Sequence, residues 1–216
     1  MNNTPHRAAS EKILGKTGVV GRFKPLHNGG ALMLEAVCRN AEHVTIGIGS
    51  ANKYNHRNPF TAEESAEMVN ALLSGRFANY TVVPIPDFAH IPEYRDGKHW
   101  KEYLAQAFGP LDSFVSGNEY LQKLLSDRYR IVEPASLIPR EQWTQLRSTA
   151  VRIAMAQNAD WKSFVPAAVA DYLEKNNLVQ RFQNEFGLQT IAMLSDNATL
   201  YGRENAEAEA LHAQEI

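Results

Sequence analysis

Five short apolar runs, rich in β-branched residues, alternate along the sequence with stretches whose apolar residues repeat with the period of a helix. The apolar runs lie at 17–21, 44–49, 80–85, 113–116 and 129–132. Glycine or proline stops most of them, as is typical of strands that end in a turn. The helical stretches lie between them, at 31–39, 62–73, 100–107 and 120–125. Strand alternating with helix is the pattern of a parallel sheet covered by helices on both faces, so we predict an α/β fold of that kind.

The sequence becomes helical after the fifth apolar run. We expect consecutive helices at 149–157 and 166–175, which form a helical C-terminal part. The length allows one α/β domain of ordinary size with an appendage. We therefore divide the 216 residues into an N-terminal extension (1–15), a single domain (16–184) and a C-terminal tail (185–216). The end of the tail is rich in Ala and Glu, which predicts either a frayed acidic helix or a disordered segment.

Charge and composition exclude several classes of partner. The formal net charge of -2 provides no overall basic field, so we expect no nucleic-acid partner. Any anion must therefore be held by a local group of side chains. No apolar run is long enough for a membrane-spanning helix, and the first residues lack the apolar core of a signal peptide. The single cysteine, Cys38, cannot form an internal disulfide, and we interpret it as a small helical residue. These features favour a cytoplasmic protein that does not associate with membranes.

The loop after the first predicted strand is the strongest candidate for a binding site, because an α/β sheet places its ligand crevice there. It reads Gly21-Arg22-Phe23-Lys24-Pro25-Leu26-His27-Asn28-Gly29-Gly30. The two adjacent glycines let the backbone approach a ligand, and free amides at the start of the following helix would point toward a phosphate. Arg22, Lys24 and His27 add three donors for an anion. A glycine-rich turn with surface cations is the alternative, and three such side chains in one loop favour the phosphate site.

This loop resembles the His-x-Gly-His signature of the nucleotidyltransferase superfamily, in the version carried by archaeal-type NMN adenylyltransferases. Gly30 stands where the family has its second histidine. In that family both histidines contact the triphosphate and stabilise charge that develops during adenylyl transfer. Removing one such donor from a preorganised site costs on the order of 10²–10³ in rate. The difference therefore concerns turnover more than nucleotide binding.

A second segment, Leu146-Arg147-Ser148-Thr149-Ala150-Val151-Arg152, resembles the family's Ser-Gly-Thr-x-Val-Arg signature. Ser148 or Thr149 is expected to cap the helix that begins there, and Arg152 can reach back toward an anion at that end. A capped helix with an exposed arginine is the alternative for this segment alone. Arg147 and Ser148 depart from the family pattern, as does Lys24, which stands where glutamine is common. We hypothesise that the added cations Lys24 and Arg147 partly replace the missing imidazole.

The resemblance extends from about residue 17 to about residue 182 and implies a Rossmann-like nucleotidyltransferase fold. The catalytic candidates that it implies are Arg22, Lys24, His27 and Arg152. The candidates for ATP binding are Gly21, Arg22, Phe23, His27, Gly29, Gly30, Ser116, Gly117, Asn118, Ser148, Thr149 and Arg152. The candidates for acceptor binding are Ser50, Asn52, Arg57, Asp87 and Trp100. In the family an aromatic residue stacks on the nicotinamide, and Trp100 is the candidate here, with a core position as an equal alternative. The connection at 87–99 is longer than the family norm.

The function that the resemblance implies is transfer of AMP from ATP to nicotinamide mononucleotide (NMN), which gives NAD and pyrophosphate. The expected partners are ATP and a small phosphate-bearing acceptor. Mg²⁺ is the expected cofactor, held mainly by the substrate phosphates, because no cluster of carboxylates suggests a metal site formed by the protein. Two alternatives stay open: the same chemistry with another acceptor, such as a pantetheine, flavin or sugar phosphate, and a nucleotide-binding protein that has lost catalysis. A homo-oligomer is also left open.

Overall fold

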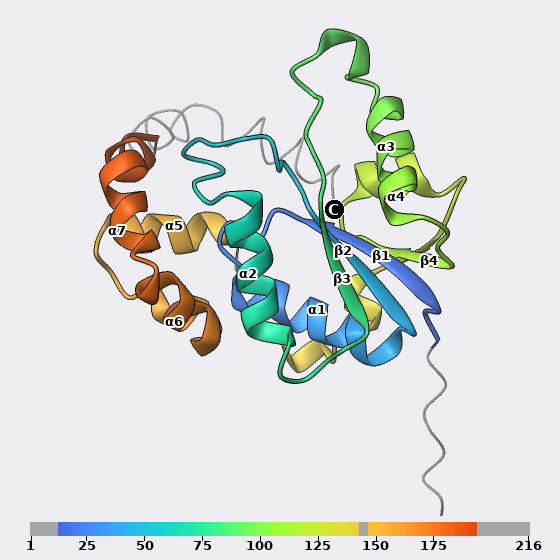
Figure 1. Ribbon diagram of the computed structural model, residues 1–216, viewed down its shortest axis with the longest axis horizontal. Helices are drawn as coiled ribbons and strands as arrows, with labels where there is room; N and C mark the ends of the chain where they lie inside the picture. The colour runs from blue at the N-terminus through green and yellow to red at the C-terminus, as the bar shows by residue number, and fades with distance from the viewer. Residues whose placement is uncertain (1–12, 143–146, 194–216) are drawn as a thin grey trace, which may run out of the picture.

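A five-stranded parallel sheet lies at the centre of the protein (Figure 1). The computed structural model describes residues 13–142 and 147–193. The strands follow the order β3-β2-β1-β4-β5, and every neighbouring pair is parallel. Their bounds are β1 (Lys16–Gly21), β2 (His43–Ile48), β3 (Tyr80–Pro84), β4 (Ser113–Val115) and β5 (Arg130–Val132). All five predicted strands are therefore confirmed.

Helices cover both faces of the sheet, as predicted from the alternating pattern. In Figure 1, α1 and α2 lie on one face, and α3 and α4 lie on the other. The α-helices are α1 (Asn28–Asn40), α2 (Ala62–Leu73), α3 (Lys98–Phe108), α4 (Glu119–Leu125), α5 (Ser148–Ala156), α6 (Ala167–Lys175) and α7 (Leu178–Phe182). A π-helical turn (Gln183–Gly187) follows α7, and residues 188–193 continue as helix. Short 3-10 turns lie at Pro92–Tyr94, Pro134–Ser136, Arg140–Gln142 and Lys162–Phe164.

Each face of the sheet packs against its own apolar cluster. Successive side chains of a strand point to opposite faces, so Val19 of β1 joins the cluster with α1 and α2. The next residue, Val20, packs against the second cluster, which contains Leu104 and Phe108 of α3. Because both faces are covered, the strands read as continuous apolar runs rather than as alternating ones. Cys38 lies within α1, in agreement with its interpretation as a small helical residue, and it is buried.

The start of α2 shows how local sequence fixes a helix end near the site. The Thr61 hydroxyl accepts from the backbone N–H of Glu64 at 3.2 Å, and the Glu64 carboxylate accepts from the backbone N–H of Thr61 at 2.9 Å. This reciprocal capping box satisfies two backbone donors at the first turn. It also holds the end of the loop at 49–61, which borders the site described below.

The predicted domain boundaries stay predictions. Leu14, inside the predicted N-terminal extension, is buried in the main core, and residues 185–193 of the predicted tail are helical. Residues 1–12 and 194–216 lie outside the described residues. Within the described residues, no helix has both the length and the apolar character needed to cross a membrane.

Candidate active site

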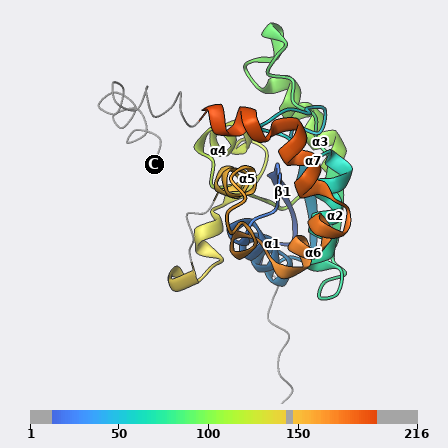
Figure 2. The ribbon, with the colours of Figure 1, turned by 90° about the vertical axis from the view of Figure 1, so that its left-hand side faces the viewer.

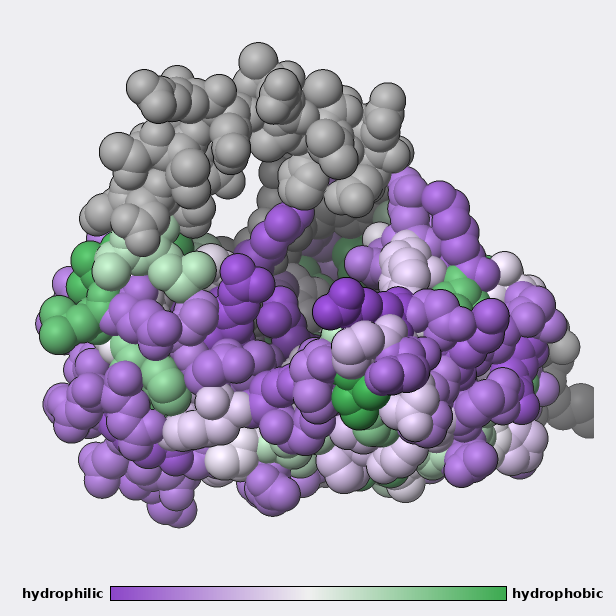
Figure 3. Space-filling view, turned by 90° about the horizontal axis from the view of Figure 1, so that it is seen from above, coloured by the Kyte–Doolittle hydropathy of each residue, from purple (hydrophilic) through white to green (hydrophobic). Residues whose placement is uncertain are grey.

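The candidate site lies where the carboxyl ends of the strands reach one edge of the sheet. β1 and β2 pair along their whole length, so Gly21 lies opposite Ile48 and the loops that follow them start side by side. The chain order reverses between β1 and β4, and such a reversal opens a crevice in a parallel sheet. Figure 2 looks toward this edge, with α5 close to the end of β1. Seen from above, this part of the surface is mostly hydrophilic and is hollowed (Figure 3).

Three clefts adjoin one another at the end of β1, and Arg22 lines all three. The apolar cleft, of about 600 Å³, is lined by Gly21, Arg22, Phe23, His27, Gly29, Gly30, Leu32, Met33, Pro134, Ala135, Ile138, Gln142 and Ser148. The cationic cleft, of about 280 Å³, is lined by Arg22, His56, Arg57, Thr149, Arg152, Ile153, Thr190 and Met193. The aromatic cleft, of about 460 Å³, is lined by Val20, Gly21, Arg22, Gly49, Ser50, Pro86, Asp87, Phe88, Ala89, Tyr94, Arg95, Gly97, Trp100, Asn118, Tyr120, Leu121 and Leu124. The predicted phosphate loop is therefore the common wall of the site.

His27 is held in a defined orientation at the start of α1. Its side chain is the N-cap, and its Nδ1 accepts from the backbone N–H of Gly30 at 3.3 Å. Burial lowers the pKa of the His27 imidazole below its usual value, which favours the neutral ring. Because Nδ1 accepts, the hydrogen of the neutral ring is on Nε2. The ring therefore has one N–H donor left for a ligand in the apolar cleft.

Gly21 is required by the path of the loop. Phe23 has a positive φ of 50°, and its ring folds back against Gly21. A Cβ added to Gly21 would lie 2.5 Å from Cζ of Phe23, closer than packed carbon atoms can approach. The glycine therefore lets the Phe23 ring form part of the apolar cleft.

The second signature segment is bonded directly to the first. Nη1 of Arg152 donates to the carbonyl of Lys24 at 2.9 Å, and the Ser148 hydroxyl donates to the carbonyl of Pro25 at 2.9 Å. The expected capping of α5 by Ser148 or Thr149 is wrong: Arg147 is the N-cap residue and makes no side-chain capping bond. The two hydroxyls have other partners, since the Thr149 hydroxyl accepts from Nη2 of Arg152 at 3.1 Å.

Positive charge collects in the cationic cleft, and no acidic residue within 13–142 or 147–193 pairs with it. Arg22, Arg57 and Arg152 form no salt bridge with any acidic residue that the structure describes. Burial, together with the charges of Arg22 and Arg57, lowers the pKa of Arg152 to about 10. Like charges held this close favour a bound anion that separates and screens them. The arrangement fits a ligand with several negative oxygens.

Lys24 lies behind the site rather than in it. Its side chain is buried, with 1% of the residue exposed, and Nζ donates to the carbonyl of Ser50 at 2.9 Å. Burial and the charge of Arg22 lower the pKa of Lys24 to about 8, against a smaller opposing effect of Glu63 and Glu64. Lys24 lines none of the three clefts, and neither does Arg147.

The acceptor-binding candidates divide between two clefts. Ser50, Asp87 and Trp100 line the aromatic cleft, whereas Arg57 lies with Arg22 and Arg152 in the cationic cleft. Asn52 lines none of the three and instead exchanges two hydrogen bonds, of 2.9 and 2.8 Å, with the backbone of Asp87. Its role is to hold the loop that carries Asp87.

Trp100 has features of both predicted roles, a position in a binding cleft and a position in the core. The ring is half-buried, lines the aromatic cleft and packs against the apolar cluster beneath α3. Two further aromatic residues of the connection at 87–99, Phe88 and Tyr94, line the aromatic cleft and were not predicted from the sequence. Tyr94 stacks on His99 with ring centroids 4.0 Å apart. In the sequence, the unusual length of the connection at 87–99 was the feature that could have indicated these additional cleft residues.

The segment Ser116–Gly117–Asn118 is mainly structural in its contacts. The Ser116 hydroxyl accepts from the backbone N–H of Asn118 at 3.1 Å, and Asn118 caps α4 through the backbone N–H of Leu121 at 3.0 Å. Of the three residues, only Asn118 lines a cleft, the aromatic one. His56, Thr190 and Met193 of the cationic cleft were not predicted.

Protein ligands for a metal ion do not gather at the site. Over the described ranges 13–142 and 147–193, no group of three or more His, Cys, Asp or Glu residues is placed to hold one. Among the described residues, Asp87 is the one acidic residue that lines any of the three clefts, and it lines the aromatic cleft.

Comparison with known proteins relates this arrangement to nucleotidyl transfer. The Cytidylyltransferase-like family matches residues 19–154. The chain is similar to the nicotinamide-nucleotide adenylyltransferase of Methanolobus tindarius, with 30% identity over 76% of this chain and 91% of that protein. The enzyme of the same name from Picrophilus torridus is 31% identical over 77% of this chain and 94% of the relative. A bifunctional NMN adenylyltransferase/ADP ribose pyrophosphatase from Francisella tularensis, solved with AMP and a Mn ion, shares the fold, with a TM-score of 0.63 and 17% identity over 88% of this chain and 55% of that chain.

Proposed function

Because the chain belongs to the cytidylyltransferase-like family of nucleotidyltransferases, we propose that it transfers AMP from ATP to NMN, giving NAD and pyrophosphate. The curated relatives named above are nicotinamide-nucleotide adenylyltransferases, and the chain covers more than nine tenths of each. The proposal rests on one observation: three clefts of different chemical character share Arg22 as a lining residue.

Each cleft suits one part of the two substrates. The apolar cleft, with Phe23 and Met33 in its walls, accepts the adenine, and the cationic cleft accepts the phosphates. The aromatic cleft accepts the acceptor's ring, which is flat and positively charged in NMN and therefore suits the face of Trp100. Since Arg22 lines all three clefts, it lies where the acceptor phosphate and the ATP phosphates must meet.

The proposed reaction is an in-line displacement that needs no nucleophile from the protein. A phosphate oxygen of NMN attacks the α-phosphorus of ATP, a new phosphorus–oxygen bond forms, and the bond to the β-phosphate breaks to release pyrophosphate. Catalysis then consists of positioning and charge neutralisation. His27, which lines the apolar cleft together with Arg22, donates from Nε2 to the ATP phosphate next to the adenosine, while Arg22, Arg57 and Arg152 stabilise the charge that moves onto the leaving pyrophosphate. Lys24 acts by holding Ser50 and, through its carbonyl, Arg152.

A divalent ion fits this site only as part of the nucleotide complex. Within the described part of the chain the clefts offer one carboxylate, that of Asp87, so we propose that Mg²⁺ enters on the triphosphate and is held mainly by the triphosphate oxygens. The ion would supply further neutralisation of the phosphates. A cytoplasmic location and a homo-oligomeric assembly stay predictions.

A coupled pyrophosphate-release assay over a panel of acceptors tests the proposal against its alternatives. We expect release with NMN and little with pantetheine phosphate or a sugar phosphate, which carry no aromatic ring. We also expect little with a flavin nucleotide, whose flat ring is larger and carries no positive charge to interact with Trp100. Preference for another acceptor would support the proposed nucleotidyl transfer and reject NMN as the acceptor. Binding of ATP without release from any acceptor would favour a nucleotide-binding protein that has lost catalysis.

A further inference from the structure

Thr190 is a buried polar residue whose hydroxyl has no hydrogen-bond partner among the described residues. The residue is 8% exposed, and its Oγ1 makes no hydrogen bond to any residue that the structure describes. A threonine in a helix ordinarily bonds through its hydroxyl to a carbonyl one turn earlier. A buried hydroxyl that lacks this bond is unfavourable unless a ligand completes it.

The unpartnered hydroxyl lies in the cationic cleft. Thr190 lines that cleft together with Arg22, Arg57 and Arg152, which form no salt bridge within residues 13–142 and 147–193. His56 lines it too, and its buried Nε2 also has no partner within the described part of the chain. Two unused polar groups and three cations in a cleft of about 280 Å³ are complementary to an anion with several acceptor oxygens.

We propose that Thr190 is a phosphate-binding residue whose hydroxyl donates a hydrogen bond to the polyphosphate of the bound nucleotide. The inference rests on the proposed function for the identity of that nucleotide, and it adds the helix at 188–193 to the binding site. Thr190 contributes a directional donor without adding a fourth positive charge to a cleft that already holds three.

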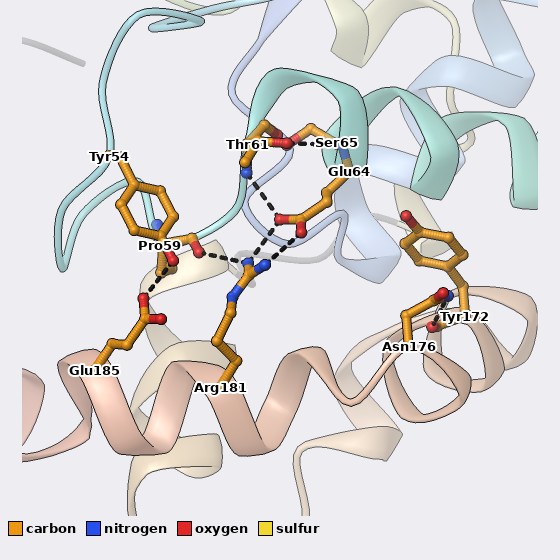
Figure 4. A network of polar contacts seen from close by, with 9 residues as sticks. All are labelled: Tyr54, Pro59, Thr61, Glu64, Ser65, Tyr172, Asn176, Arg181 and Glu185. Carbon is orange, nitrogen blue, oxygen red and sulfur yellow. Dashed lines mark hydrogen bonds and ion pairs between the residues drawn. The ribbon is translucent and has the colours of Figure 1, made fainter.

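The helix that continues to Thr190 is fixed to the loop at 49–61, which carries Arg57. Figure 4 shows Arg181 and Glu185 of this helix pointing toward Tyr54 and Pro59 of the loop. Arg181 donates to Glu64 at 2.7 Å and to the carbonyl of Pro59 at 3.2 Å. The Tyr54 hydroxyl donates to the carboxylate of Glu185. We call these five residues the Arg181 network. It joins α2, the loop at 49–61 and the C-terminal helix, by which we mean α7, the π-helical turn and residues 188–193. The two sides of the cationic cleft are therefore held at a set separation.

A further bond fixes the same helix to α5, which carries Arg152. Nε2 of Gln183 donates to the carbonyl of Met155 at 2.7 Å, close to the end of α5. Thr190 is therefore held in place relative to both Arg57 and Arg152. A hydroxyl held in this way loses little freedom when it binds phosphate.

The test is Thr190→Val, which keeps the β-branched shape and removes the hydroxyl. We expect about a tenfold loss of ATP affinity in calorimetry, unchanged NMN affinity, and recovery to near wild type with Thr190→Ser. Without nucleotide, Thr190→Val should unfold at the same or a higher temperature than wild type, because the lost hydroxyl had no partner. Thr45→Val, at a buried threonine of β2 outside the three clefts, is the matched control and should leave ATP affinity unchanged.

Unchanged ATP affinity in folded Thr190→Val, or an equal loss of affinity for ATP and NMN, would overturn the inference. A lower unfolding temperature without nucleotide would also overturn it, by showing that the hydroxyl has a structural partner. The wild-type protein, assayed in parallel for NAD formation, separates the two proposals. If the wild-type protein forms NAD and Thr190→Val binds ATP as tightly as wild type, only the proposed Thr190 contact is rejected. If the wild-type protein forms no NAD and Thr190→Val selectively weakens ATP binding, only the proposed function is rejected.

Discussion

Gly30 lies in the first turn of α1 and lines the apolar cleft, at the position where the resemblance to the His-x-Gly-His signature implies a second histidine. Its N–H already orients His27. A Cβ at this position would lie 3.1 Å from Cδ1 of Leu26, so a side chain fits if Leu26 shifts by a few tenths of an ångström. We expect Gly30→His to raise the turnover number and to leave ATP affinity nearly unchanged, because the added imidazole would act mainly in the transition state.

Steady-state kinetics with calorimetry for ATP checks this expectation. The competing hypothesis, that Lys24 and Arg147 replace the imidazole, predicts little gain in turnover from Gly30→His and a loss of turnover with Lys24→Ala. Neither of those two cations lines a cleft, so the structure favours a gain.

Lys24 should make stability depend on pH. Its pKa is about 8 in the folded protein, against the ordinary value of 10.5 in the unfolded chain. Between these values the unfolded chain binds more protons, so the free energy of unfolding should rise with pH from about 8 to about 10.5 and show no dependence from Lys24 below pH 8. Lys24→Gln retains an N–H donor for Ser50 and should remove this part of the rise. Urea denaturation across the range measures it, and identical pH profiles for wild type and Lys24→Gln would contradict it.

Among the elements, the C-terminal helix depends most on contacts far apart in the sequence. Arg181→Met leaves the Glu64 carboxylate, whose side chain is 17% exposed, without its charged partner. We expect a loss of about 1.5–3 kcal/mol in the free energy of unfolding. Adding Glu64→Gln should recover part of it, because glutamine keeps the capping box and removes the unpaired charge. Urea denaturation of the single and double variants checks this. A double variant no more stable than Arg181→Met would show that the charge is not the cause.

The regular elements could be predicted from the sequence, and the contacts between them could not. The period of apolar residues predicted β1 to β5 and α1 to α6 because each element buries a continuous face. It missed α7 and the helix after it, where patterning is weak and the position depends on Arg181 meeting Glu64 across 117 residues. Thr190 reaches the cationic cleft only through that packing, so no local motif marks it. The expected capping by Ser148 failed for the same reason: its partner, Pro25, is 123 residues away.

At the scale of the whole molecule, one loop joins three clefts into a single site. The phosphate loop after β1 is bonded to β2's loop through Lys24 and to α5 through Arg152 and Ser148. A fold assembled around this loop can align two substrates end to end, which is what adenylyl transfer requires. The central claim is therefore that the α-phosphate of ATP moves to NMN while the outer two phosphates leave together.

Incubation of the wild-type protein with NMN, Mg²⁺ and ATP labelled on its α-phosphate tests that claim most directly. We expect the label in NAD and none in pyrophosphate, with one pyrophosphate formed for each NAD. Label that remains in ATP, or that appears only as free AMP while NMN is unchanged, would contradict the account.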